Sequence, residues 1–335
     1  QMRVDGGLMG DLSGVPRNAK RLEGLGYHGA VTAETSHDPF FPLLLAAQET
    51  QDIELVTSIA VAFSRTPMNL ANIGHDLNSF SKGRFVLGLG SQIRPHITKR
   101  FSMPWSKPAA RMREFISAMR AIWDCWHNGT QLSFEGDFYT HSLMTPMFTP
   151  LDIEYGAPKV FLAAVGPLMT EVAGEVAVGV IIHAFTTEKY LREVTLPAVE
   201  KGLAKAGRSR DDFEISYPGF IVTGTTEEQY NTSKQAVCKQ IAFYGSTPAY
   251  APVLGVHGWG DLQPELNKLS KQGKWDEMGS LITDDILEEF AVVAEIDDVV
   301  DKFKNRYGDL VDRTMGSLPA RDDDHAKELL TKLSA

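Results

Sequence analysis

The sequence predicts an α/β fold: a single (β/α)8 or TIM barrel with insertions after the fourth and seventh strands. Short apolar runs rich in β-branched residues alternate along the chain with segments of helical periodicity. Eight such strands fit into 335 residues, the number and about the length expected of this barrel. No linker composition or charge run divides the chain, so we expect one domain spanning residues 1–335. Its insertions are expected at about residues 91–108, 129–158 and 245–290.

Residues 54–92 contain the clearest strand–helix–strand unit. Residues 54–59 read as a buried strand, and Pro67 suits the first turn of the helix that follows. Residues 84–88 form the next strand, and 89–92 its exit loop. Two buried strands joined by an amphipathic helix form a parallel pair, so both strand exits face the same mouth.

The remaining elements continue the alternation. Further strands are expected at residues 2–8, 29–33, 159–163, 178–183, 213–222 and 310–317. Helices are expected at residues 16–25, 39–50, 109–126, 168–177, 187–206, 226–244, 275–290, 296–307 and 325–333, with a hairpin at 129–139. Residues 93–107 show no period, and a long irregular connection in a compact domain is usually functional.

Composition limits the partners. A net charge of −10 argues against nucleic acid as the main partner. The sequence lacks an apolar run of about 18 residues, so no membrane span is expected, and the first residues lack a signal-peptide pattern. Two isolated cysteines, Cys125 and Cys238, indicate a reducing cytoplasm. We therefore expect a cytoplasmic protein that acts on a small molecule.

The reactive groups of such a barrel lie at the carboxyl ends of its strands. The candidates are Glu34, His37 and Asp38 after strand two, residues 60–65 after strand three, Ser91, Gln92 and His96 after strand four, Val165 and Gly166 after strand five, His183 after strand six, and Arg313 near the end of strand eight.

Glu34 and His37 are the candidates for proton transfer. A carboxylate such as Glu34 is costly to desolvate alone, so it is either paired with a nearby arginine or placed for function. The unperturbed pKa of a histidine side chain lies near neutrality, so His37 is a candidate general acid or base. Alternatively, Asp38 caps the following helix and His37 is an ordinary loop residue.

The turn before residue 168 could bind an anion. Backbone N–H groups at a helix start favour phosphate, Gly166 lets a ligand approach the backbone, and Thr170 could add a hydroxyl. A tight strand–helix turn would equally explain the sequence Gly166-Pro167. The basic residues of the loop 93–107 suggest an anionic ligand, although a solvated loop is the commoner outcome.

Other motifs are missing from the sequence. Gly88 and Gly90 lack the third glycine of a dinucleotide fingerprint, because residue 93 is Ile. The sequence contains neither a metal-binding signature nor a Gly-x-Ser-x-Gly nucleophile elbow.

Several segments resemble the bacterial luciferase-like monooxygenase superfamily. They include TSIAVAFSRTPMNLA (57–71), SKGRFVLGLGSQ (81–92) and LAAVGP (162–167). Longer segments, such as ETSHDPFFPLLLAA (34–47) and FTTEKYLREVTLPA (185–198), are similar to its F420-dependent oxidoreductase branch. The likeness covers nearly the whole chain.

The resemblance implies a cofactor, coenzyme F420, an 8-hydroxy-5-deazaflavin that moves hydride and does not activate oxygen. It implies a ring inside the barrel mouth, resting on a bulge of strand three that contains a non-prolyl cis peptide, here Ser58–Ile59. The corresponding residues are Ser58, Ile59 and Ala60 at the bulge, Ser91 and Gln92 beside the ring, and Val165 and Gly166, near Thr170, at the phosphate.

One position departs from the family pattern. Members of this branch carry an acid followed by His after strand two, whereas here Thr35 follows Glu34 and His37 comes two residues later. The proton-transfer group is therefore either His37 or Glu34 alone.

The resulting prediction is an F420-dependent oxidoreductase that transfers hydride between F420 and a small organic substrate. One alternative is an FMN-dependent monooxygenase with a partner reductase, and another is a flavin- or deazaflavin-binding protein without turnover. Family members are commonly homodimers or higher homo-oligomers, which we expect here too.

Overall fold

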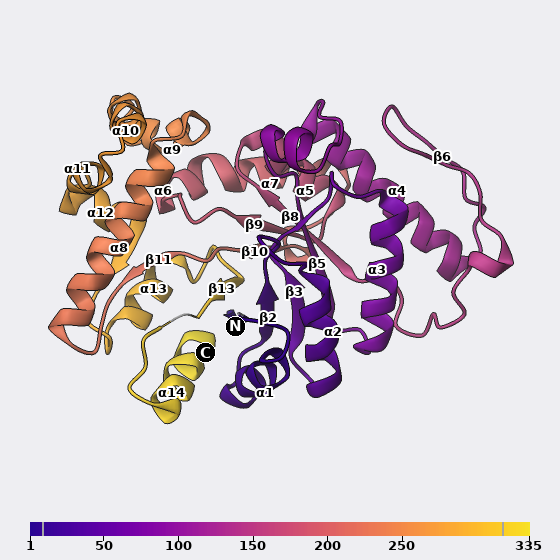
Figure 1. Cartoon of the computed structure of the whole chain (residues 1–335), viewed down its shortest axis with the longest axis horizontal. Coiled ribbons are helices and arrows are strands. Elements are labelled where there is room, and N and C mark those ends of the chain that lie inside the picture. The colour runs from indigo at the N-terminus through magenta and orange to yellow at the C-terminus, as the bar shows by residue number, and fades with distance from the viewer. Residues whose placement is uncertain (9, 317) are drawn as a thin grey trace.

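The computed structural model describes residues 1–8, 10–316 and 318–335, and its centre is a closed barrel of parallel strands (Figure 1). The strands pair in the order β3-β2-β1-β13-β10-β9-β8-β5. Strand β13 therefore pairs with β1, and an additional pairing between β3 and β5 closes the ring. The barrel strands, in spatial order, are β1 (Arg3–Gly7), β2 (Gly29–Thr32), β3 (Glu54–Thr57), β5 (Phe85–Gly90), β8 (Lys159–Ala164), β9 (Gly179–Ile182), β10 (Glu214–Ser216) and β13 (Arg313–Met315). The predicted (β/α)8 barrel is confirmed.

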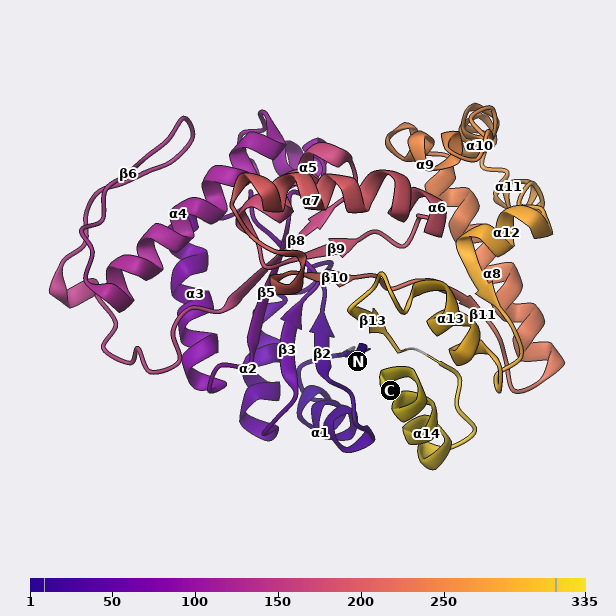
Figure 2. The ribbon, with the colours of Figure 1, turned by 180° about the vertical axis from the view of Figure 1, so that it is seen from behind.

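Helices surround the barrel, as Figures 1 and 2 show from two sides. They are α1 (Val15–Leu25), α2 (Phe40–Glu49), α3 (Pro67–Phe80), α4 (Pro108–Asn128), α5 (Pro167–Val176), α6 (Glu188–Tyr190), α7 (Leu196–Lys205), α8 (Glu227–Gly245), α13 (Val299–Tyr307) and α14 (Asp323–Ser334). Helix α3 illustrates the local cause: Pro67 begins it, and Thr66 and Asn69 form a reciprocal cap at its start. Buried Leu70 and Leu77 then face the sheet.

Three segments interrupt the alternation of barrel strands and helices. After β5 comes a loop with one π-helical turn, η1 (His96–Arg100). After α4 come the hairpin strands β6 (Phe134–Glu135) and β7 (Thr140–His141) and the turn η2 (Pro146–Phe148). After α8 come η5 (Pro248–Tyr250), α9 (Ala251–Gly255), α10 (Leu262–Lys271), α11 (Trp275–Ser280) and α12 (Asp284–Phe290), packed around their own apolar cluster.

The predicted seventh strand, residues 213–222, was wrong as one element. Strand β10 ends at Ser216, and β11 (Phe220–Val222) pairs with β12 (Ala291–Val293) in a separate two-stranded sheet. Pro218, which has no N–H to donate, and Gly219, at φ +73°, lie at the break.

Three further boundaries differ from the prediction. The helix expected at 275–290 breaks into α11 and α12, because Thr283 caps the start of α12 by accepting from the Ile286 N–H. The helix expected at 187–206 contains a π-helical turn, η3 (Leu191–Thr195), and is followed by η4 (Arg210–Asp212). The eighth strand is only β13, and Ser317 at the end of its predicted range lies outside the described residues.

The sequence predicted that Arg313 lies near the carboxyl end of strand eight, and this prediction was wrong. It begins β13 and is buried at the opposite, amino-terminal end of the barrel. There its guanidinium binds Asp5 at 2.6 Å and Glu54 at 2.9 Å, with Glu214 at 3.7 Å. Glu54 begins β3 and Glu214 begins β10. The ion cluster therefore closes the amino-terminal end of the barrel, which we call its floor, next to the Phe161 ring.

Within the described residues, no helix is long and apolar enough to cross a membrane. Across the same residues, no group of three or more His, Cys, Asp or Glu side chains is placed to hold a metal ion.

Candidate functional site

The candidate site is the mouth at the carboxyl ends of β3, β5, β8 and β9, which are neighbours in the barrel. The sequence-predicted residues 58–60, 91–92 and 165–166 follow the first three of these strands. The fold therefore brings segments that are more than 100 residues apart to one edge.

Strand three ends in a bulge. The peptide bond between Ser58 and Ile59 is cis, as the resemblance implied. The chain then continues as β4 (Ala60–Val61), which pairs with the last residues of β5. A Cβ on Gly90 would lie 2.5 Å from the Ile59 side chain, so a larger residue there would require Ile59 to move.

Glu34 holds this bulge. Its backbone N–H donates to the Ile59 carbonyl at 3.1 Å, and its carboxylate accepts the Val61 N–H at 3.1 Å. Both carboxylate oxygens also accept from Arg65, at 2.5 and 2.9 Å. The Glu34 side chain is only 7% exposed. The sequence left open whether Glu34 pairs with a nearby arginine or is placed for function. The structure contains the arginine pair.

Arg65 extends the same contact toward helix α2. Its guanidinium lies 3.7 Å from Asp38 and 5.1 Å from the Phe40 ring centre. Asp38 in turn accepts the Phe40 and Phe41 N–H groups, at 2.7 and 3.1 Å. The predicted helix cap is thus confirmed, and His37 beside it is exposed on the exit loop of β2.

The exit of β5 has an unusual backbone. Gln92 has φ +56°, a left-handed conformation that is uncommon for a residue other than glycine. Its side-chain carbonyl accepts the Ile93 N–H at 3.2 Å, and the Ser91 hydroxyl donates to the Gln92 carbonyl at 2.9 Å. Such conformations persist where the surrounding structure fixes them, often at ligand sites.

A small cavity lies between the exits of β8 and β9, at the start of α5, and has room for about one water molecule. Val165, Thr170, His183 and Thr186 line it. The Thr170 hydroxyl donates to the Gly166 carbonyl at 2.9 Å. Thr186 is 3% exposed, and its hydroxyl has no hydrogen-bond partner among the described residues. A Cβ on Gly166 would meet no atom within 4 Å beyond its chain neighbours, so a ligand could approach the backbone on that side.

His183 follows β9 and packs against the end of α8 and the start of the third insertion. Its Nδ1 accepts the Phe185 N–H at 3.0 Å, which leaves the proton of the neutral ring on Nε2. The ring stacks on Tyr250 and meets Tyr244 edge-on, at centroid distances of 4.8 and 4.6 Å. Burial lowers the pKa of His183 to about 4, so the ring is neutral at physiological pH.

The sequence did not identify Thr186, Tyr244 and Tyr250. Tyr244 lies at the end of α8 and Tyr250 in η5, both more than 60 residues beyond β9, so only the tertiary fold brings them to the mouth. Thr186 carries no motif, and its unpaired hydroxyl becomes visible only in the folded structure.

These residues fit a ligand that carries an anionic group. A buried hydroxyl without a partner and a helix start lie at one side of the mouth, and both favour an oxygen acceptor. The bulge lies at the other side of the mouth, above the apolar interior of the barrel, which includes Val56 and Val86.

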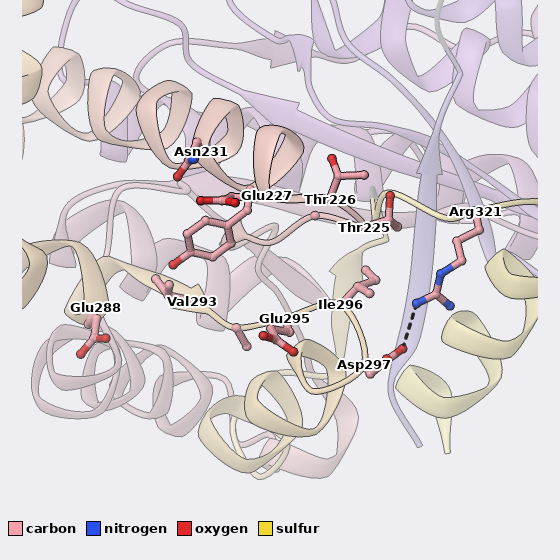
Figure 3. Close-up of a pocket in the computed structure, with 13 residues that line it drawn as sticks. Thr225, Thr226, Glu227, Asn231, Glu288, Val293, Glu295, Ile296, Asp297 and Arg321 are labelled. Atoms are coloured by element: carbon pink, nitrogen blue, oxygen red, sulfur yellow. Dashed lines mark hydrogen bonds and ion pairs between the residues drawn. The ribbon is translucent and has the colours of Figure 1, made fainter.

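A larger cavity of about 820 Å³ lies elsewhere, at the carboxyl ends of β11 and β12 (Figure 3). Glu227, Glu288, Glu295 and Asp297 make its lining acidic, and Arg321 is paired with Asp297 at 3.4 Å. None of the residues lining it directly follows a barrel strand. Volume alone therefore does not identify the functional site of this fold.

Comparison with known proteins agrees with the geometry. The uncharacterized protein Rv1360 of Mycobacterium tuberculosis is 54% identical over 315 residues, covering 94% of this chain and 93% of that protein. The putative coenzyme F420-dependent oxidoreductase Rv3520c of the same organism is 26% identical over 302 residues, covering 85% and 86%.

Among solved structures, the coenzyme F420 dependent tetrahydromethanopterin reductase from Methanopyrus kandleri superposes with a TM-score of 0.76 at 22% identity, covering 98% of this chain and 96% of the other. The family model for luciferase-like monooxygenases matches residues 2–313. The chain therefore belongs to the luciferase-like monooxygenase family.

Proposed function

We propose that the protein is an F420-dependent oxidoreductase that transfers hydride between coenzyme F420 and a small organic substrate. The observation that carries the proposal is the convergence at one mouth of a strand-three bulge, a left-handed residue at Gln92 and the unpaired Thr186 hydroxyl beside the start of α5. A relative named as F420-dependent supports the choice of cofactor.

The residues divide the binding task. Ser58, Ile59 and Ala60 would support one face of the ring, and Ser91 and Gln92 would lie at its edge. The backbone amides of Val165 and Gly166 would hold the phosphate at the start of α5, near Thr170. When bound, F420 supplies hydride donation or acceptance at a carbon of its ring.

The accompanying proton needs a side chain with a free titrating atom. Both oxygens of Glu34 are occupied by Arg65, so we assign Glu34 to positioning the bulge. His37 is exposed on the β2 exit loop and has the ordinary chemistry of a general acid or base. We assign the proton transfer to His37, with an H37N variant expected to lose turnover and keep cofactor binding.

We also propose that the chain forms one domain and assembles as a homodimer or higher homo-oligomer. The segment 142–155 supports the assembly, because it presents a run of exposed apolar side chains next to α3. Those more than two-thirds exposed are Leu143, Met147, Phe148 and Leu151. Sedimentation of the purified protein tests this directly.

Titration of the purified protein with F420 and with FMN, followed by fluorescence, tests the cofactor. Saturable F420 binding and hydride transfer across a substrate panel are expected. FMN binding with oxygen-dependent turnover would support the monooxygenase alternative instead. Tight F420 binding without reduction of any substrate would indicate a binding protein.

A further inference from the structure

Thr223, the residue that follows β11, has a buried hydroxyl without a hydrogen-bond partner. The residue is 2% exposed, and no described residue donates to its hydroxyl or accepts from it. Leaving such a group unpaired inside a protein costs free energy, so a hydroxyl of this kind usually meets a water molecule or a ligand. The surroundings of Thr223 therefore indicate what it binds.

Thr223 faces a hollow of about 410 Å³ beside the start of α8. The hollow lies between β11, the first two turns of α8 and Pro319, which follows β13. Figure 1 shows α8 next to β11. The volume is within the range of about 300–1,000 Å³ that is typical of small-molecule sites. None of its lining residues belongs to the mouth at β3, β5, β8 and β9, so the hollow is a separate place.

Both donors and acceptors line the hollow. The side-chain oxygen of Gln229 accepts the Thr225 N–H and hydroxyl, at 2.9 and 2.6 Å, so the amide NH2 of Gln229 is left to donate elsewhere. Thr232 and Ser233 add hydroxyls, and Ser233 donates its own to the Ile221 carbonyl at 3.4 Å. A ligand here would thus meet groups of both kinds.

The hollow also has a defined charge. Glu228 supplies an exposed carboxylate, and in the described part of the chain no lysine or arginine lies within 4 Å of it. The acidic cavity of Figure 3 lies against the other face of the same turns of α8, through Glu227 and Asn231. Carboxylates on both sides of the helix disfavour an anionic ligand in the hollow.

A cation does not match the hollow either, because it would leave the Gln229 amide NH2 without an acceptor. A hydroxyl group both donates and accepts a hydrogen bond. A molecule with several hydroxyls can therefore satisfy Thr223, Gln229 and Glu228 together. Ile221 and Pro319 offer apolar contacts to the C–H groups of the same molecule.

We propose that this hollow binds a small uncharged molecule with several hydroxyl groups, of about the size of a monosaccharide, and that the Thr223 hydroxyl is its buried contact. The site is distinct from the barrel mouth, so the proposal does not depend on which cofactor the mouth binds.

The test compares three sugars that share one ring and differ in charge. Saturation-transfer difference NMR of the purified protein is recorded with galactose, with galactosamine, which is a cation, and with galacturonate, which is an anion. The T223V variant keeps the shape of the side chain and removes the hydroxyl.

The matched control is T314V. Thr314 is also 2% exposed, and its hydroxyl also lacks a partner among the described residues. It differs from Thr223 in lining a cavity with room for only about one water molecule.

The wild type is expected to bind galactose in preference to both charged sugars. T223V should bind galactose at least about threefold more weakly, because it loses one hydrogen bond, and T314V should bind it as the wild type does. Both variants should unfold at a higher temperature than the wild type, because each removes a buried hydroxyl that has no partner. The exposed E228Q variant should bind galacturonate more tightly than the wild type does.

Equal galactose binding by T223V and T314V would overturn the proposal, because the sugar would then bind elsewhere. A stronger signal from either charged sugar would overturn the ligand class, and the lack of saturable binding by galactose would show that the hollow holds only water. A lower unfolding temperature in T223V, with unchanged galactose binding, would assign its hydroxyl to the fold instead.

Discussion

At the residue scale, Glu34 connects the stability of the protein to the geometry of its mouth. The E34Q change keeps the shape of the side chain and removes the charge that faces Arg65. Since breaking a buried ion pair leaves the remaining charge unpaired, we expect a loss of about 3 kcal/mol in the free energy of unfolding. Urea denaturation measures it.

The comparison for this prediction is an ion pair on the surface. Arg21 and Asp323 are both more than half exposed. The R21Q variant should lose less than about 1 kcal/mol, because solvent screens such pairs. Equal losses in E34Q and R21Q would show that the Glu34 contact does not stabilise the bulge.

His183 leads to a prediction about pH. Its burial lowers the pKa to about 4 from the ordinary 6.5, so between these values the unfolded chain binds a proton that the folded protein does not. Stability therefore falls as the pH is lowered from about 6.5 toward 4, by up to about 3 kcal/mol, and is unaffected above this range. Denaturation curves at pH 4.5 and 7 measure the difference.

Replacing His183 with Phe removes the titrating group and keeps an aromatic ring against Tyr250. The H183F variant should lose part of the stability difference between pH 4.5 and pH 7. An unchanged pH dependence in H183F would contradict the assignment.

Residue identities at the mouth were partly predictable from sequence. The cap at Asp38 and the bulge at Ser58–Ile59 follow from local rules and from resemblance, and both are present. The arginine pair of Glu34 was one of two alternatives, because sequence does not show which cation a carboxylate meets. Arg313 was placed at the wrong end of the barrel, because a strand of only three residues leaves its start uncertain.

At the scale of elements, the segment 142–157 is held by a few polar contacts. Asp152 accepts from Ser79 at 2.7 Å and lies 3.3 Å from the buried His75. Asn78 donates to the Gly156 carbonyl at 3.0 Å. The segment has little secondary structure of its own, so these contacts fix its position on α3.

The D152A variant should release this segment while the barrel stays folded. We expect faster cleavage by a low concentration of chymotrypsin near Leu151, and a change of less than about 1 kcal/mol in global stability. The matched control is D276A, whose carboxylate is exposed on α11 and pairs with Lys239 at 3.0 Å. Cleavage at the same rate in both variants would argue against a tether at Asp152.

Element types were predictable wherever the apolar pattern was long and regular, as in α3 and α4. The errors lie where single residues interrupt a pattern. Pro218 and Gly219 divide the seventh strand, and Thr283 begins a new helix inside an acidic stretch that reads as continuous. Local caps and breaks override average periodicity at such points.

At the scale of the whole molecule, the buried ions at the barrel floor join the first strand to the last. Arg313 is 1% exposed and binds Asp5 across the β1–β13 pairing. The R313M variant leaves that carboxylate buried without its partner, so we expect a loss of about 3–5 kcal/mol in the free energy of unfolding.

The double variant D5N/R313M removes the stranded charge and should recover part of the loss, as urea denaturation would show. A double variant as unstable as the sum of both single variants would indicate that the two residues do not interact.

The overall architecture followed from counting alternating elements, because a closed parallel barrel is the simplest arrangement of eight of them. The composition of the mouth did not follow in the same way. Tyr250 and His183 meet only after an insertion folds back over β9, and no local pattern encodes that contact.

The proposed function requires that this mouth binds F420 and uses it for hydride transfer. The most direct measurement is a side-by-side fluorescence titration of the purified wild-type protein with F420 and with FMN. We predict saturable binding of F420 at stoichiometric amounts, with much weaker binding of FMN. Saturable binding of FMN without binding of F420 would contradict the account.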